Sequence, residues 1–192
     1  MKTTLFVPTL NEIDGMRVIM PRVKREWVDE ILILDGGSTD GTVEYAKEHG
    51  YPVLMQQRKG ARYAYNEAFA QIKTGIVIPF SPDGNSIPEL IPPLIEKSKQ
   101  GYDMVTASRY LDGAKSEDDG IITGFGNRMF TFLINQFYGA KYTDAMVMYR
   151  AWSVDLFWEL DLDKDESYAF EEKVFFTRVG IEPLLSIRAA KR

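Results

Sequence analysis

The sequence contains no cysteine, a single histidine and no long apolar run. Without cysteine the chain forms neither a disulfide framework nor a thiolate metal site. Its formal net charge of -5 lacks the basic excess of a general nucleic-acid-binding protein, so nucleic acid is not an expected partner. Nowhere do 18 apolar residues follow one another, and the first apolar stretch, ended by Pro8, is too short for a signal peptide. These absences favour a cytoplasmic protein and leave peripheral contact with a membrane open.

The composition is that of a folded protein. The chain has 192 residues, of which 45% are hydrophobic and 27% are charged. This length and balance suit one domain with a sizeable core. We therefore expect a single domain over residues 1–192, with an alternating half, 1–110, and a second half, 111–192, of different pattern.

Short apolar runs alternate with helical stretches in the first half. The expected strands cover 3–7, 31–34, 53–55, 75–80 and 102–107, and the expected helices cover 11–27, 42–49, 61–72 and 88–98. Such alternation predicts an α/β fold, a three-layer domain whose mostly parallel twisted sheet is flanked by helices. In the second half we expect helices over 124–138, 154–160 and 170–179, and a last strand over 181–187.

Polar segments follow three of the predicted strands, at 8–12, 35–41 and 81–85. Residues of these types also build ordinary turns. However, ligands of parallel α/β proteins bind beyond the carboxyl ends of the strands, where such segments converge. Three polar segments at successive strand ends therefore favour a ligand site.

Two carboxylates stand out in these segments. Asp35 ends a buried strand, where a carboxylate needs a partner or a ligand, and it can accept a hydrogen bond from a nucleobase or a ribose hydroxyl. Asp83 is a suitable ligand for a hard divalent cation that also binds substrate phosphates, and Asn85 can add a second oxygen.

Several motifs, in order along the chain, resemble those of glycosyltransferase family 2. Residues 7–12 read Val-Pro-Thr-Leu-Asn-Glu, and residues 34–42 resemble the family's Asp-x-Gly-Ser-x-Asp-Gly-Thr segment. Lys59-Gly60 with Ala64 and Asn66 resembles its Gly-x-Ala-x-Asn stretch, and 107–110 resemble its Gly-Ser-Arg-Tyr. Thr143-Asp144 followed by Arg150 is similar to the corresponding segment of the dolichol-phosphate-mannose-synthase-like branch.

The resemblance implies a GT-A fold, a UDP- or GDP-linked sugar donor, a lipid-phosphate or saccharide acceptor, and inversion at the anomeric carbon. Residues 1–110 would then bind the nucleotide sugar and 111–192 would form a shortened acceptor side. The donor-binding residues that it implies are Pro8, Thr9, Asn11, Glu12, Asp35, Gly37, Ser38, Lys59, Gly60, Asn66 and Asp83. Asp83 and Asn85 would hold Mg²⁺ or Mn²⁺. Arg109 would lie near the donor phosphates or an anionic acceptor, and Asp144 and Arg150 would lie on the acceptor side.

The sequence departs from the family at the metal motif, because Ser81 replaces the first aspartate of Asp-x-Asp. Asp83 and Asn85 then hold the cation with the donor phosphates, or metal dependence is weakened, or the protein is inactive. For a saccharide acceptor, Asp144 is the first candidate base and Glu171 or Glu172 the second. A lipid phosphate is already an anion and needs no base.

Two rival functions remain: a catalytically weak or inactive nucleotide-sugar-binding protein, which Ser81 suggests, and a sugar nucleotidyltransferase, which residues 8–12 oppose. The aromatic helix 124–138 also has two interpretations. It contacts a lipid or membrane, or it packs into the core. We favour the core, because Arg128 and Lys141 alone provide a weak basic face.

Overall fold

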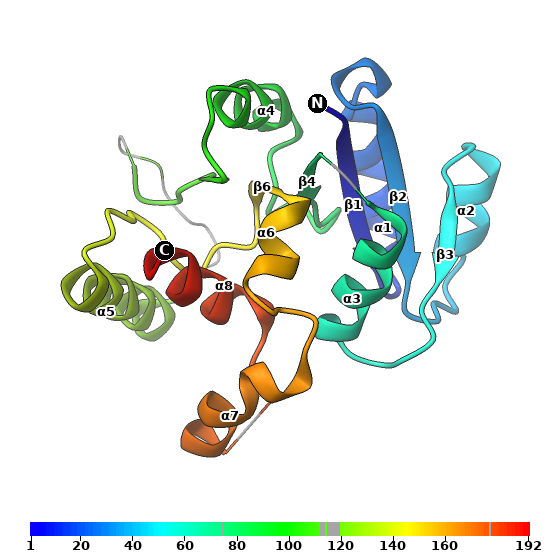
Figure 1. Ribbon diagram of the computed structural model, residues 1–192. Helices are drawn as coiled ribbons and strands as arrows, with labels where there is room; N and C mark the ends of the chain where they lie inside the picture. Colours follow the sequence, from blue (N-terminus) through cyan, green and yellow to red (C-terminus); the bar gives the residue numbers. More distant parts are fainter. Residues whose placement is uncertain (74, 112–113, 115–119, 177) are drawn as a thin grey trace. The chain divides into compact units, whose positions relative to one another are not determined.

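The computed structural model describes residues 1–73, 75–111, 114, 120–176 and 178–192. The fold is α/β, as predicted (Figure 1). Its strands are β1 (Thr3–Thr9), β2 (Glu30–Asp35), β3 (Val53–Met55), β4 (Ile76–Pro79), β5 (Met104–Thr106) and β6 (Arg150–Ser153). The helices are α1 (Ile13–Ile19), α2 (Thr42–Glu48), α3 (Ala61–Gln71), α4 (Ile91–Lys99), α5 (Ile121–Tyr138), α6 (Val154–Glu159), α7 (Ala169–Phe175) and α8 (Ile181–Ala190). Short 3₁₀ helices cover Met20–Arg22, Arg25–Trp27, Pro88–Leu90 and Asp165–Tyr168.

The six strands form one sheet in the order β3-β2-β1-β4-β6-β5. β1 runs parallel to β2 and β4, and β2 runs parallel to β3. Leu5, Phe6 and Val7 of β1 are completely buried, as expected for a central strand covered on both faces. The parallel register places Thr9 opposite Asp35, so β1 and β2 end side by side.

The chain forms two compact units. The first, which we call the sheet unit, comprises residues 1–105 and 149–156. The second, the helical unit, comprises residues 106–148 and 157–192. The expectation of a single catalytic domain over 1–192 stays a prediction.

The structure differs from the sequence prediction at two elements. Residues 181–187 form part of α8 instead of a strand. Ile181, Leu184 and Leu185 are its buried apolar residues, and their spacing is that of a helix face. The sequence prediction also missed β6, which pairs antiparallel with β4. Its four residues include only two apolar side chains, too few for a recognisable strand pattern.

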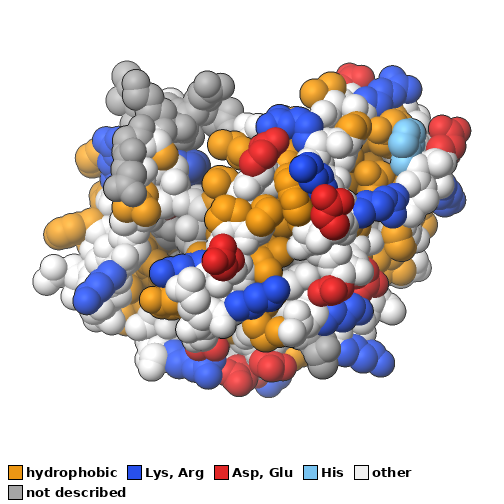
Figure 2. Space-filling view, turned by 90° about the horizontal axis from the view of Figure 1, so that it is seen from above, with side chains coloured by type: hydrophobic (Ala, Val, Ile, Leu, Met, Phe, Trp, Pro, Cys, Tyr) orange, Lys and Arg blue, Asp and Glu red, His pale blue; other side chains and the backbone are white. Residues whose placement is uncertain are grey.

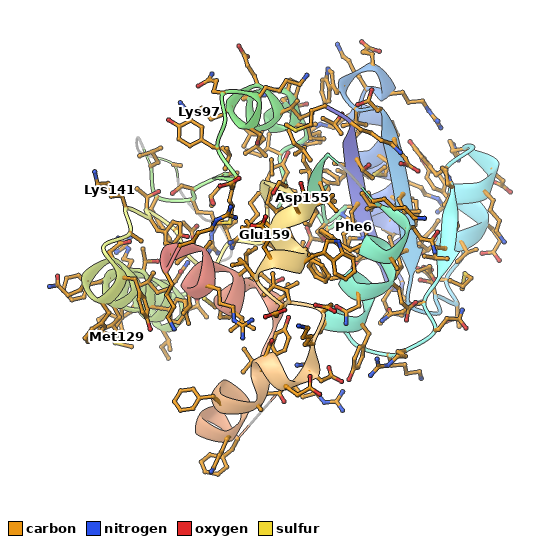
Figure 3. The ribbon with its side chains drawn as sticks, viewed as in Figure 1. Phe6, Lys97, Met129, Lys141, Asp155 and Glu159 are labelled. Atoms are coloured by element: carbon orange, nitrogen blue, oxygen red, sulfur yellow. The ribbon has the colours of Figure 1, made fainter. Side chains whose placement is uncertain are left out.

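Helix α5 leaves most of its aromatic residues exposed, so the expectation of a core helix is wrong. Ile122 is 86% exposed, Phe125 68%, Phe132 63% and Phe137 74%. Figure 3 shows Met129 also pointing outward from this helix. Among the described helices, none is both long enough and apolar enough to cross a membrane.

The single histidine has a structural role. His49 follows α2, and its ring stacks on Tyr45 with 3.9 Å between ring centroids. Its Nδ1 lies 2.9 Å from the Tyr45 carbonyl oxygen. Figure 2 shows this residue at the surface, in pale blue, with acidic and basic side chains mixed on the same face. These contacts fix the His49 ring against the last turn of α2.

Candidate functional site

The carboxylate of Asp35 organises the carboxyl end of β2. Its Oδ2 accepts hydrogen bonds from the Thr9 hydroxyl at 2.8 Å and the Ser38 hydroxyl at 2.6 Å. Its Oδ1 accepts from the backbone N–H groups of Gly37 at 2.9 Å and Ser38 at 2.7 Å. Burial by itself would raise the pKa of Asp35, but the hydrogen bonds from Ser38, Thr9 and Gly37 outweigh it and lower that pKa. Asp35 is thus an ionised carboxylate that shapes the loop after β2.

The loop after β1 is bound to the loop after β2 through Asn11. The Asn11 N–H donates to the Ser38 Oγ at 2.7 Å, and the Thr39 N–H donates to the Asn11 Oδ1 at 2.9 Å. Asn11 adopts the left-handed conformation, with φ of 57°, which asparagine tolerates better than most residues. The neighbouring Glu12 N–H donates to the Thr42 hydroxyl at 2.9 Å. The two loops therefore form one structure at the edge of the sheet.

Asp40 links the first turns of α1 and α2. Its Oδ2 accepts from the N–H of Ile13, the first residue of α1, at 3.0 Å. Its Oδ1 accepts from the N–H of Thr42, the first residue of α2, also at 3.0 Å. One carboxylate thereby satisfies an unpaired N–H of each helix, and both helices begin at the same edge of the sheet.

Asp83 and Asn85 occupy an exposed turn after β4. The Asn85 N–H donates to the Asp83 Oδ1 at 2.9 Å, and the Asn85 Nδ2 lies 3.2 Å from the Asp83 Oδ2. The described residues contain no group of three His, Cys, Asp or Glu side chains that could hold a metal. The oxygen ligands present fit Mg²⁺ or Mn²⁺ only where substrate phosphates complete the coordination.

Helix α1 lies against this turn. A Cβ atom added to Gly15 would stand 2.1 Å from the carbonyl oxygen of Pro82, so only glycine allows the close approach. Burial, followed by the charges of Asp83 and Asp40, raises the pKa of Glu12. Glu12 therefore lies within electrostatic reach of Asp83 and Asp40, and the loop after β1 and the Asp83 turn belong to one edge of the sheet.

A further loop of this edge follows β3. Its first residue, Gln56, donates its N–H to the Asp35 carbonyl oxygen at 2.8 Å and its Nε2 to the Gly60 carbonyl oxygen at 2.8 Å. Lys59 is exposed in this loop, and Asn66 is half-buried on α3. Sequence reasoning missed Gln56, since no local pattern shows that its backbone continues the β2–β3 pairing.

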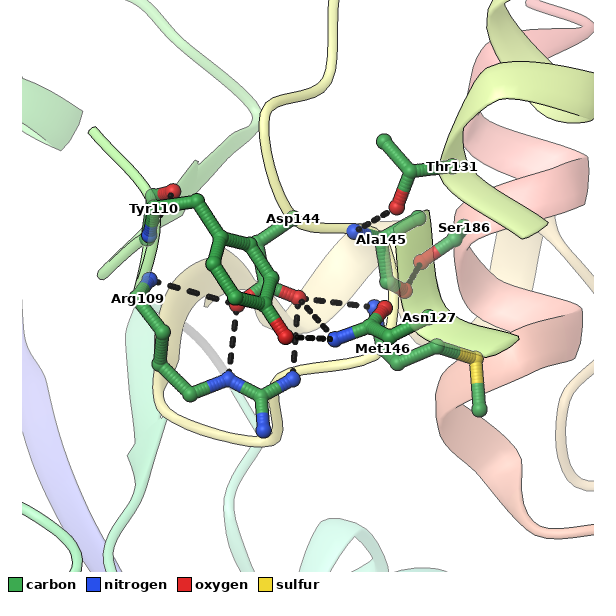
Figure 4. Close-up of polar contacts among 9 residues, drawn as sticks. Arg109, Tyr110, Asn127, Thr131, Asp144, Ala145, Met146 and Ser186 are labelled. Carbon is green, nitrogen blue, oxygen red and sulfur yellow. Dashed lines mark hydrogen bonds and ion pairs between the residues drawn. The ribbon is translucent and has the colours of Figure 1, made fainter. Parts of the chain in front are cut away.

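In the helical unit, Asp144 is the centre of a polar cluster (Figure 4). Arg109 donates its Nε to the Asp144 Oδ2 at 2.7 Å, its Nη2 to Oδ1 at 3.1 Å and its backbone N–H to Oδ2 at 3.2 Å. The Asp144 residue is 2% exposed. Burial would raise its pKa, but the hydrogen bonds and charge of Arg109 lower it overall. A carboxylate with this partner is a weak base, so the geometry favours a positioning role.

One neighbour of Asp144, Asn127, was not expected from the sequence. The Asn127 Nδ2 donates to the Asp144 Oδ1 at 3.2 Å and to the Tyr110 hydroxyl oxygen at 3.0 Å. The guanidinium carbons of Arg109 and Arg128 lie 5.5 Å and 5.3 Å from the centre of the Tyr110 ring. The available signal was a polar residue, Asn127, in a mostly apolar helical stretch. The sequence alone does not show whether such a residue faces the interior or the surface.

The remaining predicted residues lie in different settings. Arg150 is 1% exposed in the sheet unit, and its Nη1 lies 3.5 Å from the Met104 Sδ. Glu172 accepts the Val179 N–H at 3.3 Å. The side chain of Glu171 lies outside the described part of the structure. The donor-site candidates all belong to the sheet unit, together with Arg150, whereas Arg109, Asp144 and Glu172 belong to the helical unit.

This combination of fold and polar edge defines a class. The family model described as glycosyl transferase family 2 matches residues 4–161. The chain therefore belongs to glycosyltransferase family 2, as its motifs predicted, and it has the GT-A fold.

The relatives include glycosyltransferases of archaea. Glycosyltransferase AglJ of Haloferax volcanii is 28% identical over 192 residues, covering 98% of this chain and 58% of AglJ. The low-salt glycan biosynthesis hexosyltransferase Agl6 of the same organism is 32% identical, covering 81% of this chain and 39% of Agl6. The dolichol-phosphate mannosyltransferase of Pyrococcus furiosus is 32% identical over 126 residues, covering 62% of this chain and 36% of the mannosyltransferase.

A solved structure has the same fold. It is the glucosyl-3-phosphoglycerate synthase of Mycobacterium tuberculosis in complex with Mn²⁺, UDP-glucose and phosphoglyceric acid. That chain is 26% identical with a TM-score of 0.62, and the match covers 81% of this chain and 57% of the synthase. This chain thus spans about half the length of the relatives that it matches.

Proposed function

We propose that this protein transfers a hexosyl group from a UDP- or GDP-linked sugar to the phosphate of a lipid, with inversion at the anomeric carbon. Family membership supports the reaction class. The observation that carries the choice of acceptor is the ion pair between Asp144 and Arg109, with Nε and Oδ2 2.7 Å apart. A carboxylate held this way is a poor proton acceptor, which suits an acceptor that has no proton to lose.

The sheet unit would bind the donor. The loops after β1 and β2 would contact the base and ribose through backbone groups and through Thr9, Asn11 and Glu12. Asp35 would shape this surface, because its oxygens already accept four hydrogen bonds within the chain. Hydrogen bonds between the loops after β1 and β2 hold both loops in place before the nucleotide binds. This preorganisation lowers the entropic cost of binding.

Asp83 and Asn85 are the residues that would hold a divalent cation with the donor diphosphate. A bound cation of this kind neutralises negative charge that develops on a leaving diphosphate. The Mn²⁺ in the mycobacterial synthase complex supports this role. With Ser81 in place of a second carboxylate, affinity for the cation would depend strongly on the nucleotide.

The acceptor would be bound by the helical unit. In the reaction, the bond between the anomeric carbon and the diphosphate oxygen breaks, and an oxygen of the lipid phosphate forms the new bond to that carbon. Arg109, with its side chain 30% exposed, would attract the anionic phosphate, and Asp144 would orient Arg109. The names of relatives such as the undecaprenyl-phosphate 4-deoxy-4-formamido-L-arabinose transferase of Klebsiella pneumoniae support a lipid phosphate. A saccharide acceptor would require a base, for which Glu172 is the described candidate.

Helix α5 would place the protein at the cytoplasmic face of a membrane. Its exposed apolar side chains include Phe125, Phe132 and Phe137. Residues 120–143 contain no acidic residue in a chain of net charge -5. Lys141 is exposed beyond the end of the helix (Figure 3). An apolar helix face without acidic residues suits the surface of an anionic bilayer.

The donor proposal predicts stabilisation by the correct nucleotide. UDP or GDP with Mn²⁺, at about 100 times its dissociation constant, should stabilise the fold by about 2.7 kcal/mol. In a domain of this size that corresponds to a rise in melting temperature of about 5–10 °C. Differential scanning fluorimetry measures the shift, with ADP and with each nucleotide in EDTA as controls. If neither UDP nor GDP changes the melting temperature in the presence of Mn²⁺, the proposed donor site is refuted.

The membrane proposal predicts a specific loss of vesicle binding. In Phe125→Ser/Phe132→Ser, removal of two exposed aromatic side chains should weaken co-sedimentation with phosphatidylglycerol vesicles by about tenfold or more. The matched control is Val18→Ser on α1, because Val18 is 67% exposed and lies outside the helical unit. Equal binding by the double variant and the wild type would remove α5 from the membrane contact.

A second function has its own support, because Ser81 removes one carboxylate from the expected metal motif. In that case the protein would bind a nucleotide sugar without transferring it. Incubation with radiolabelled UDP- and GDP-sugars and a polyprenyl phosphate separates the two. Nucleotide-dependent stabilisation together with no labelled lipid would support the binding function.

A further inference from the structure

Helix α5 has a row of polar side chains on its buried side that binds the segment before β6. Residues 142–146 have no helix or strand, so their backbone groups need other partners. Asn135 donates its Nδ2 to the Tyr142 carbonyl oxygen at 2.8 Å and accepts the Tyr142 N–H at 2.9 Å. One turn earlier, the Thr131 hydroxyl accepts the Ala145 N–H at 3.1 Å.

Asn127, one turn earlier again, differs from the other two residues of this row. Its amide contacts a carboxylate instead of the backbone, since Nδ2 donates to the Asp144 Oδ1 and to the Tyr110 hydroxyl oxygen. An ionised Asp144 only accepts hydrogen bonds, so Asn127 must present its NH₂ group to it. Figure 4 shows the Asn127 amide bonded to both the Tyr110 hydroxyl and Asp144, with Arg109 also bonded to that carboxylate.

The remaining atom of this amide is informative. Asn127 is 8% exposed, and its Oδ1 is buried without a hydrogen-bond partner among the described residues. Leaving a buried acceptor unpaired costs stability, whereas an apolar side chain of the same shape would avoid that cost. Asn127 is therefore a poor choice for packing alone, and what it contributes must come from its NH₂ group.

We propose that Asn127 is a positioning residue that holds the Asp144 carboxylate and the Tyr110 hydroxyl in one arrangement and thereby orients Arg109. The ionisable groups of this cluster are Asp144, Arg109, Tyr110 and, across the Tyr110 ring, Arg128. The effect on turnover rests on the proposed function. The effect on the Asp144 carboxylate does not.

The test compares Asn127→Leu with Thr131→Val. Both changes remove one polar group from the buried side of α5, but only the first touches Asp144. The pKa of Asp144, followed by ¹³C NMR and assigned with Asp144→Asn, should rise in Asn127→Leu, because a hydrogen bond that stabilises the carboxylate is lost. In Thr131→Val the pKa of Asp144 should stay at its wild-type position. In Asn127→Leu, kcat/KM for the lipid phosphate should also fall by about tenfold or more.

Asn127→Asp provides a second variant should leucine prevent folding. It keeps the shape but places a like charge beside Asp144, so the pKa of Asp144 should rise further. An unchanged Asp144 titration in either folded Asn127 variant, or an equal shift in Thr131→Val, would overturn the proposal. Wild-type protein that transfers no sugar would contradict the proposed function, while the titration would still decide the role of Asn127.

Discussion

Replacing Gly15 by alanine is expected to reduce the free energy of unfolding by about 3 kcal/mol. The new Cβ would stand 2.1 Å from the Pro82 carbonyl oxygen, and neither backbone can yield without moving α1 or the turn after β4. For a chain of this size the melting temperature should fall by about 6–12 °C. Thermal denaturation followed by circular dichroism measures the change.

Gly126→Ala is the matched control. Gly126 is a helix residue of α5, and a Cβ added there meets no atom within 4 Å. Because alanine favours a helix more than glycine does, this variant should be as stable as the wild type or more stable by up to about 1 kcal/mol. Equal melting temperatures for Gly15→Ala and the wild type would show that α1 does not press on the Asp83 turn.

Replacing Asp83 by alanine is expected to reduce sugar transfer by about 10³-fold, since charge on the leaving diphosphate would lose its stabilisation. Stability should change by less than about 0.5 kcal/mol, because Asp83 lies in an exposed turn. Initial rates with a radiolabelled UDP- or GDP-sugar and a polyprenyl phosphate, over a Mn²⁺ titration, measure the effect.

Asp155→Ala controls for the loss of one negative charge. Asp155 is exposed in the first turn of α6, and its removal should leave the rate within about twofold of the wild type, as is usual for such surface changes. Full activity of Asp83→Ala would exclude Asp83 from the mechanism. Because Asp83 is the single carboxylate left of the expected motif, that result would also argue against a cation site in this turn.

The sequence was sufficient for the parallel part of the sheet. Short apolar runs separated by turn residues are local signals, and they predicted strands at the positions of the parallel strands β1 to β4 and also at β5. The same signals placed Asp35 at the end of β2, where the structure has it. They failed at β6, because four residues of mixed character carry no period, and at 181–187, where an apolar run forms a helix.

The charge environment of the site residues could not be predicted in the same way. Asp144 was a candidate base because it is a carboxylate in a segment that resembles a family motif. Its contact with Arg109, 35 residues earlier in the chain, depends on packing. That contact lowers its pKa and favours a positioning role. Asn127 was missed for the same reason, because its role depends on its hydrogen bonds to Asp144 and Tyr110.

The sequence by itself therefore determined the family, the first five strands along the chain and the polar segments that follow three of them, because these depend on residues close together in the chain. Only the tertiary structure decided that α5 exposes its aromatic residues, that α1 needs glycine against Pro82, and that Asp35 and Asp144 are held as ionised carboxylates. These features depend on contacts between residues that are far apart in the sequence. Hydrogen bonding and burial at each position are set by such contacts and not by the neighbouring residues in the chain.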